Sequence, residues 1–263
     1  MKKLLSILAV AVLAGVLMAS QALAFSLGGY TGEIQFKYNN WDYGTLYAPG
    51  TVIDHGGSGS GQTDAYGIVS VSVIQGRDAG GNWVNLWTPT ATEAIEGIFY
   101  GLSDDKVNFG ATSGDIQAIG GKFALYLGTP NLKPNAGPGL VPALNTAPAD
   151  IWDATDGTLF LTADFVPGII PGDLTTTYNS HFTAITSPPT GHGDAYLSIT
   201  GGNYADMFGT QMLLASDFKG TEFGWPSTSF DPVTGTAVPE PLTLLLLGMG
   251  LFGLGLGKRY RRD

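Results

Sequence analysis

Short stretches of alternating polar and apolar residues, separated by glycines, dominate the middle of this 263-residue chain. In the clearest stretch, Ile34, Phe36 and Tyr38 alternate with charged or amide side chains. Successive side chains of a strand point to opposite faces, so a period of two predicts a strand with one buried face and one wet face. Such strands are typical of antiparallel sheets. Further strands are predicted over residues 66–75, 93–100, 116–127, 158–165, 176–186, 195–200 and 211–214.

The amino-acid composition agrees with an all-β fold and excludes a long-helix protein and a disulfide framework. Charged residues make up only 13% of the chain, which also holds 39 glycines and 15 prolines but no cysteine. A long-helix protein would need more Ala, Glu, Lys and Leu in periodic order, and a disulfide framework or thiolate site would need cysteine. We therefore predict that the body is a two-layer antiparallel β-sandwich, jelly-roll-like, with a signal helix before it and a transmembrane helix after it.

Charge excludes one class of partner. Residues 25–238 hold six Lys and Arg against 20 Asp and Glu, a formal net charge of −14. Nucleic-acid binding depends on clustered basic side chains that displace counterions from phosphates. Because this body has no such cluster in its sequence, we expect no nucleic-acid partner.

The first 24 residues have the three parts of a secretory signal peptide. Lys2 and Lys3 form a positive start, residues 4–19 are apolar, and Ala22 and Ala24 place small side chains at the cleavage site. This pattern predicts export and cleavage by signal peptidase before Phe25.

The last 41 residues divide into a polar segment and a membrane-directed tail. After a body at 25–222, residues 223–238 are rich in Pro, Ser and Thr and are predicted to form a tether. Residues 242–257 carry no charge, and as a helix they would be about 24 Å long, short of a ~30 Å hydrocarbon core. The basic residues that follow should stay cytoplasmic. They are Lys258, Arg259, Arg261 and Arg262.

The motif Pro239, Glu240, Pro241, followed by the apolar segment and the basic end, resembles the PEP-CTERM sorting signal of exopolysaccharide-producing Gram-negative bacteria. The resemblance covers residues 239–263 only. It implies that an exosortase recognises the three-residue motif while the helix at 242–257 holds the chain in the inner membrane. It also implies delivery to the cell surface or extracellular matrix, where extracellular polysaccharide is an expected partner. The body resembles no family in its sequence.

Residues of catalytic or metal-binding type are scattered along the body. His55, His181 and His192 lack the close spacing of a metal site, so we interpret them as surface-loop residues and predict no metal or cofactor. Residues 57–61 spell Gly-Ser-Gly-Ser-Gly, which matches the letters of a nucleophile elbow. No helix is predicted after this segment, so we interpret it as a flexible linker.

Acidic residues allow two further hypotheses. Paired acids at Asp104 with Asp105 and at Glu93 with Glu96 would suit a glycoside hydrolase if they faced a cleft. As neighbours on turns, however, such acids are usually solvated. Tryptophans that could line the cleft are Trp83, Trp87 and Trp152. Calcium binding by Asp150, Asp153 and Asp156 is left open against an ordinary Asx-rich turn.

These observations favour an exported, non-enzymatic surface or matrix protein. The alternative is a carbohydrate-binding, lectin-like module that uses exposed Trp and Tyr as stacking platforms. A secreted hydrolase is the third hypothesis. A cluster of exposed aromatic rings would favour the second, and a deep cleft with two facing carboxylates the third.

Overall fold

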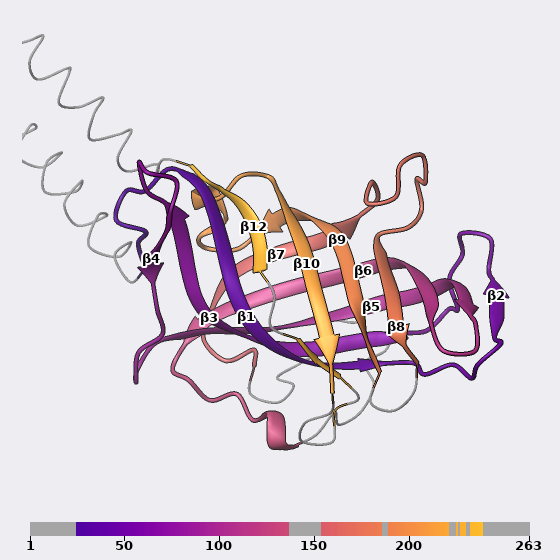
Figure 1. Ribbon diagram of the computed structural model, residues 1–263. Coiled ribbons are helices and arrows are strands. Elements are labelled where there is room, and N and C mark those ends of the chain that lie inside the picture. Colours follow the sequence, from indigo (N-terminus) through magenta and orange to yellow (C-terminus); the bar gives the residue numbers. More distant parts are fainter. Residues whose placement is uncertain are drawn as a thin grey trace, which may run out of the picture. The chain divides into compact units, whose positions relative to one another are not determined.

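In the computed structural model, the described residues are 25–136, 154–185, 189–220, 225, 227–229 and 232–238 (Figure 1). The chain divides into two units, one made of residues 1–31 and 239–263 and the other of residues 32–238. In the first unit the described part is a short turn, in which the Tyr30 amide donates to the Leu27 carbonyl over 3.2 Å. The second unit contains every strand found among the described residues.

The fold is all-β and antiparallel, as predicted. Besides strands, the described residues contain two short 3-10 helices, η1 (Pro134–Ala136) and η3 (Ala205–Met207). All eight predicted strands are present, several of them longer than expected. The strands are β1 (Gly32–Gly44), β2 (Val52–Asp54), β3 (Ala65–Arg77), β4 (Trp83–Trp87), β5 (Ala94–Phe109), β6 (Gly114–Gly128), β7 (Thr158–Val166), β8 (Tyr178–Ala184), β9 (Thr190–Gly201), β10 (Gln211–Lys219), β11 (Ser227–Ser229) and β12 (Pro232–Ala237).

The sheet closes on itself. Its hydrogen-bonded order runs β1-β12-β10-β9-β7-β6-β5-β3, and β3 pairs again with β1. At two positions of this ring, two shorter strands lie end to end between the same pair of neighbours. β7 and β8 both pair with β6 and β9. β12 and β11 both pair with β1 and β10. The predicted two-layer, jelly-roll-like sandwich is therefore not confirmed, because the described strands form one continuous sheet. Closure leaves its ring strands paired on both sides.

Glycines create the bend that makes this arrangement possible. Gly101 on β5 and Gly120 and Gly121 on β6 have φ values of 77°, 73° and 96°, a region that other residues rarely adopt. The two strands pair across this point. Before the bend β6 pairs with β8, and after it β6 pairs with β7. β6 therefore changes partner at these consecutive glycines.

The segment expected to be a tether contains two strands instead. β12 pairs with β1 over six residues and also with β10, and β11 pairs with the same two strands. The sheet therefore continues to Ala237, and the next amide, that of Val238, donates to the Met207 carbonyl over 2.9 Å. The composition of this segment resembles a linker, but its backbone supplies the hydrogen bonds that close the sheet.

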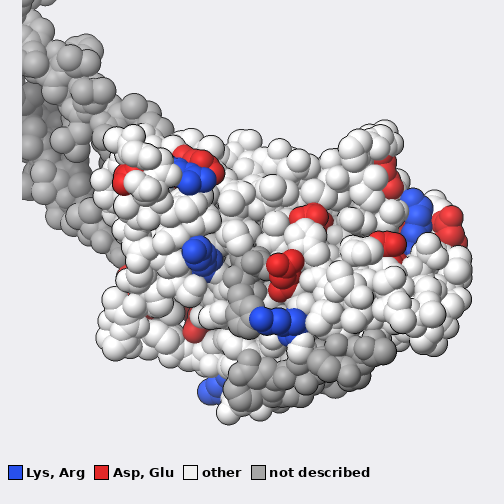
Figure 2. Space-filling view, in the orientation of Figure 1, with Lys and Arg blue, Asp and Glu red and all other residues white. Residues whose placement is uncertain are grey.

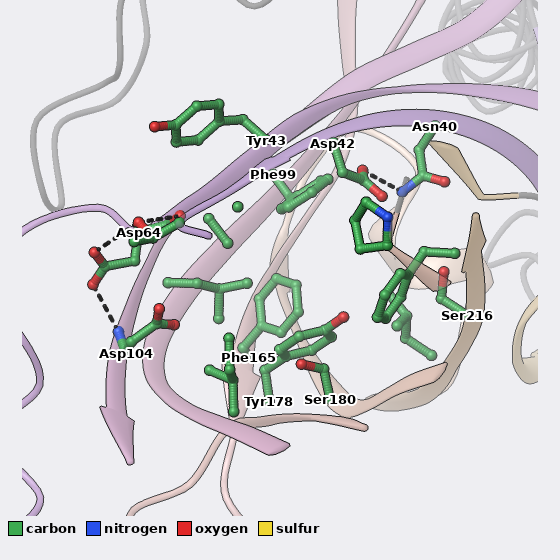
Figure 3. Close-up of a pocket in the computed structure, with 18 of the residues that line it drawn as sticks. Asn40, Asp42, Tyr43, Asp64, Phe99, Asp104, Phe165, Tyr178, Ser180 and Ser216 are labelled. Atoms are coloured by element: carbon green, nitrogen blue, oxygen red, sulfur yellow. Dashed lines mark hydrogen bonds between the residues drawn. The ribbon is translucent and has the colours of Figure 1, made fainter. Parts of the chain in front are cut away.

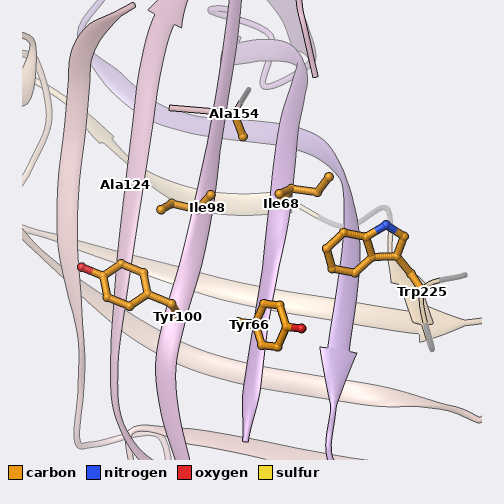
Figure 4. Close-up of a cluster of buried hydrophobic side chains, with 7 residues drawn as sticks. All are labelled: Tyr66, Ile68, Ile98, Tyr100, Ala124, Ala154 and Trp225. Carbon is orange, nitrogen blue, oxygen red and sulfur yellow. The ribbon is translucent and has the colours of Figure 1, made fainter. Parts of the chain in front are cut away.

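A cluster of buried hydrophobic side chains covers part of the outer face of the sheet (Figure 4). Trp225 is fully buried there, and its indole N–H donates to the Pro134 carbonyl over 2.8 Å. Its ring meets that of Tyr66 edge to face at 6.4 Å between centroids. β3 therefore carries apolar side chains on both faces: Val69 lines the interior, while Ile68 packs in the outer cluster.

The predicted signal helix and transmembrane helix lie outside the described residues. None of the helices within the described ranges has the length and apolar character that crossing a bilayer requires.

Candidate functional site

The interior of the closed sheet holds a cavity of about 100 Å³ (Figure 3). One water needs roughly 10–15 Å³ on this scale, so the space admits a small organic molecule. A closed sheet of about eight strands leaves an interior wide enough for its own side chains or for one small ligand. The apolar wall consists largely of phenylalanine rings, namely Phe99, Phe123, Phe165, Phe182 and Phe218.

One polar region of the cavity is a hydrogen-bonded chain from β10 to β1. The Ser216 hydroxyl donates to Ser229 Oγ over 2.7 Å, and Ser229 donates in turn to Asn40 Oδ1. Asn40 Nδ2 donates to Asp42 Oδ1 over 2.5 Å. Burial raises the pKa of Asp42 to about 8, against the lowering effect of that last hydrogen bond. Asp42 is therefore largely a neutral acid at pH 7.

The other polar region is built on Asp64 and Asp104. Asp64 Oδ2 accepts from the Asp104 amide over 2.9 Å and from the Ser60 hydroxyl. Asp104 Oδ2 accepts from the Tyr47 hydroxyl over 2.8 Å. Burial, and then the negative charge of Asp64, raise the pKa of Asp104 to about 7, although the Tyr47 bond lowers it. In Figure 3 this region and the Asp42 region lie at opposite sides of the drawn cavity.

The polar residues of the cavity were not predicted from the sequence, because polar side chains on strands were expected to face solvent. The alternation of residues 34, 36 and 38, continued by two steps, places Asn40 and Asp42 on the inner face of β1. Asp104 and Asp105 were interpreted as solvated acids on a turn, which is wrong. Both are buried within β5, which continues to Phe109.

The other predicted acids hold the fold together. Asp105 Oδ1 accepts the amides of Gly57 and Gly59 over 2.8 and 3.1 Å. Glu96 Oε2 accepts the amides of Asn131 and Leu132 over 3.2 and 3.1 Å. Glu93 Oε1 accepts the Trp87 indole N–H over 2.9 Å.

The glycine-serine segment is anchored, so its interpretation as a linker is wrong. It connects β2 with β3 inside one unit. Besides the two amides held by Asp105, Gly59 lies so close to Ser103 that a Cβ would be 2.6 Å from the hydroxyl oxygen. No side chain larger than hydrogen fits there without movement.

The histidines are exposed, as expected, but two of them lie on strands rather than in loops. His181 on β8 and His192 on β9 are directly opposite each other. His192 contacts Asp194 and Asp217 at 3.0 and 2.9 Å. Within the described ranges no three His, Asp or Glu side chains converge in a way that suits a metal ion.

The remaining candidates are only partly within the described residues. Asp150, Asp153 and Trp152 lie outside them, whereas Asp156 accepts a hydrogen bond from Asn131 Nδ2 over 2.7 Å. Trp83 and Trp87 are the first and last residues of β4, with a register shift between them, and the Arg77 guanidinium covers the Trp83 ring at 3.9 Å from its centroid.

Residues 237–262 match the PEP-CTERM protein-sorting motif, which contains Pro239, Glu240 and Pro241. The predicted sorting signal is therefore confirmed, and this motif is characteristic of exosortase-dependent export in Gram-negative bacteria. No curated protein and no solved structure matches the chain. The motif residues, the basic end, and Ala22 and Ala24 at the predicted signal cleavage site lie outside the described residues.

Proposed function

We propose that this chain is an exported, non-enzymatic surface or matrix protein that an exosortase sorts, and that its body holds a small ligand inside the closed sheet. The match at residues 237–262 supports sorting by an exosortase. Signal peptidase acts after Ala24, and the apolar segment at 242–257 stays in the inner membrane until the exosortase acts near Glu240. The cavity among the strands supports the second part.

The absence of an enzymatic role is supported by what the acids do. Glycosidases need two carboxyl groups about 5–10 Å apart that face one bond. Asp105, Glu93 and Glu96 are each hydrogen-bonded to a loop or an indole, and Asp42 and Asp104 belong to separate polar regions of the cavity. This arrangement fits holding a molecule better than cleaving one.

We further propose that the mature protein associates with extracellular polysaccharide. The face seen in Figure 2 carries few charges, and its Lys and Arg are scattered. A weakly charged surface suits contact with uncharged sugar units. A lectin-like role is the second candidate, because β4 carries two partly exposed indoles, those of Trp83 and Trp87.

The sorting proposal is tested in cells with three variants. Glu240→Ala should leave export and membrane insertion intact but block release from the membrane. Replacement of Arg259, Arg261 and Arg262 together should let the tail slip through the bilayer, because the basic stop is lost. Glu222→Ala removes an acid outside the motif and is the matched control.

Fractionation and intact-mass measurement distinguish the outcomes. The wild-type product should start at Phe25 and lack the basic end, and the Glu222 variant should behave identically. Release of the Glu240 variant at the wild-type level would overturn exosortase recognition of this motif. Binding of the full chain to a glycan array, and its loss in Trp83→Ala with Trp87→Ala, would favour the lectin-like role over simple matrix association.

A further inference from the structure

Three side chains with carboxyl groups line the cavity. They are Asp42, Asp64 and Asp104, and no Lys, Arg or His lines the space. Asp64 is fully engaged, since its two oxygens accept from Ser60, Gln62 and neighbouring groups. Asp42 and Asp104 each accept a hydrogen bond through one carboxyl oxygen only, and of these two Asp104 has the lower pKa.

Two residues of the cavity wall that are themselves almost fully buried each have a side-chain oxygen without a hydrogen-bond partner among the described residues. Asp104 is 4% exposed, and its Oδ2 bonds to Tyr47 while its Oδ1 accepts nothing. Ser180 is also 4% exposed, and its hydroxyl has no partner. Buried polar atoms are usually satisfied, by protein, by water or by a ligand. Both residues line the cavity, so a molecule inside it can satisfy them.

We propose that the cavity binds a small organic cation, an ammonium compound whose positive group pairs with the Asp104 carboxylate and whose apolar groups contact the phenylalanine wall. This inference rests on the ligand-holding part of the proposed function and names the ligand class. Aromatic rings attract cations through their electron-rich faces, and Phe99, Phe165 and Phe182 contribute rings to the lining.

Size and charge both agree with this ligand class. An apolar cavity of about 150 Å³ accommodates benzene, so about 100 Å³ suits a molecule of roughly four to six non-hydrogen atoms. A cation also compensates the burial of Asp104, whose pKa is raised to about 7 by burial and by Asp64. A neutral ligand of the same size would leave that carboxylate without a counter-charge.

The test compares tetramethylammonium with tert-butanol, which has nearly the same size and shape but no charge. The full chain, purified in a non-ionic detergent, is titrated calorimetrically at about pH 8.5, where a carboxyl group with a pKa near 7 is mostly ionised. Sodium chloride at equal concentration controls for ionic strength. We expect saturable binding of tetramethylammonium and none of tert-butanol.

Two isosteric variants locate the binding. Asp104→Asn should weaken tetramethylammonium binding by at least about tenfold, because a buried charge pair is lost. Asp206→Asn removes the same charge from an exposed position outside the cavity and should change the affinity less than about twofold. Thermal melts of both variants verify that they are folded.

Three results would overturn the proposal: equal binding of tert-butanol, no binding of either probe, or equal losses in the Asp104 and Asp206 variants. The first would leave a cavity for neutral ligands, and the third would indicate non-specific attraction to an acidic body. None of them affects the cell-based test at Glu240, so failure of the ligand class and failure of the sorting proposal remain distinguishable.

Discussion

His181 lies directly opposite His192 across the β8–β9 pairing, and each ring contacts an aspartate on the next strand. His181 Nδ1 is 2.7 Å from Asp115 Oδ1 on β6, and His192 Nδ1 is 2.9 Å from Asp217 Oδ1 on β10. The result is an acid–histidine–histidine–acid row across four strands on the outer face. Partial burial lowers the pKa of His192, but the bonds and charges of Asp217 and Asp194 outweigh this and raise it above 6.5.

Asp217→Asn should therefore lower the pKa of His192, as measured by NMR titration of the ring protons. A raised folded-state pKa stabilises the protein fully below the unfolded value near 6.5, and this contribution disappears as the pH rises through the folded-state value. The variant should be less stable than wild type at pH 5.5 and equal to it at high pH. Because the pair is exposed and screened, the difference should stay below about 1 kcal/mol. An unchanged histidine pKa would contradict the assignment.

Asp104→Asn should make stability less dependent on pH. The carboxyl pKa rises from 3.8 to about 7 on folding, so the wild-type protein loses stability as the pH increases between these values. The variant should exceed wild type by roughly 2–4 kcal/mol above pH 8 and match it near pH 4. Urea unfolding at both pH values measures the difference, and Asp206→Asn serves as the exposed control. A constant offset at both pH values would contradict the raised pKa.

Gly121→Ala should destabilise the sheet at its bend. Gly121 has a φ of 96°, and a Cβ there would lie 2.7 Å from Leu102 and 2.8 Å from Phe165. Strain and overpacking together should cost about 2–4 kcal/mol. Gly44→Ala is the matched control, because nothing lies within 4 Å of its Cβ position and its φ is outside the left-handed region. Equal unfolding midpoints for the two variants would show that the bend tolerates a side chain.

Trp225→Ala should remove the main contact of the outer cluster. The side chain is fully buried, packs on Tyr66 and donates a hydrogen bond to Pro134. Its truncation should cost about 3–5 kcal/mol in the free energy of unfolding. Leu174→Ala, at a side chain that is 85% exposed, should change stability by less than about 0.5 kcal/mol. A small effect at Trp225 would mean that the cluster is dispensable.

The features of the fold that could be predicted are those that depend on short stretches of sequence. Alternation located eight strands because each pattern lies within a dozen residues. β12 was missed because its residues, Pro-Val-Thr-Gly-Thr-Ala, show no clear alternation and contain two weak strand formers. Its place is determined by partners on β1 and β10, and closure of the sheet depends on the same distant pairings.

The site was less predictable for a related reason. An aspartate on a strand looks the same in sequence whether it faces solvent or a cavity, and only the curvature of the sheet decides between them. Asp104 and Asp105 are neighbours, yet the first lines the cavity and the second anchors the glycine loop. The sorting motif could be predicted because a membrane enzyme recognises a linear sequence, which needs no tertiary context.

The pairing of Gly32 with Ala237 has a consequence for the timing of export. A chain that crosses a membrane with its N-terminal end first delivers β1 early and β12 last. Until β12 arrives, β1 and β10 expose hydrogen-bonding edges that invite pairing with other chains. The strand that removes these edges is followed, one residue later, by Pro239. Completion of the body and arrival of the sorting motif are therefore nearly simultaneous events, and a chain cut short before β12 would lack both the means to close and the signal to be released.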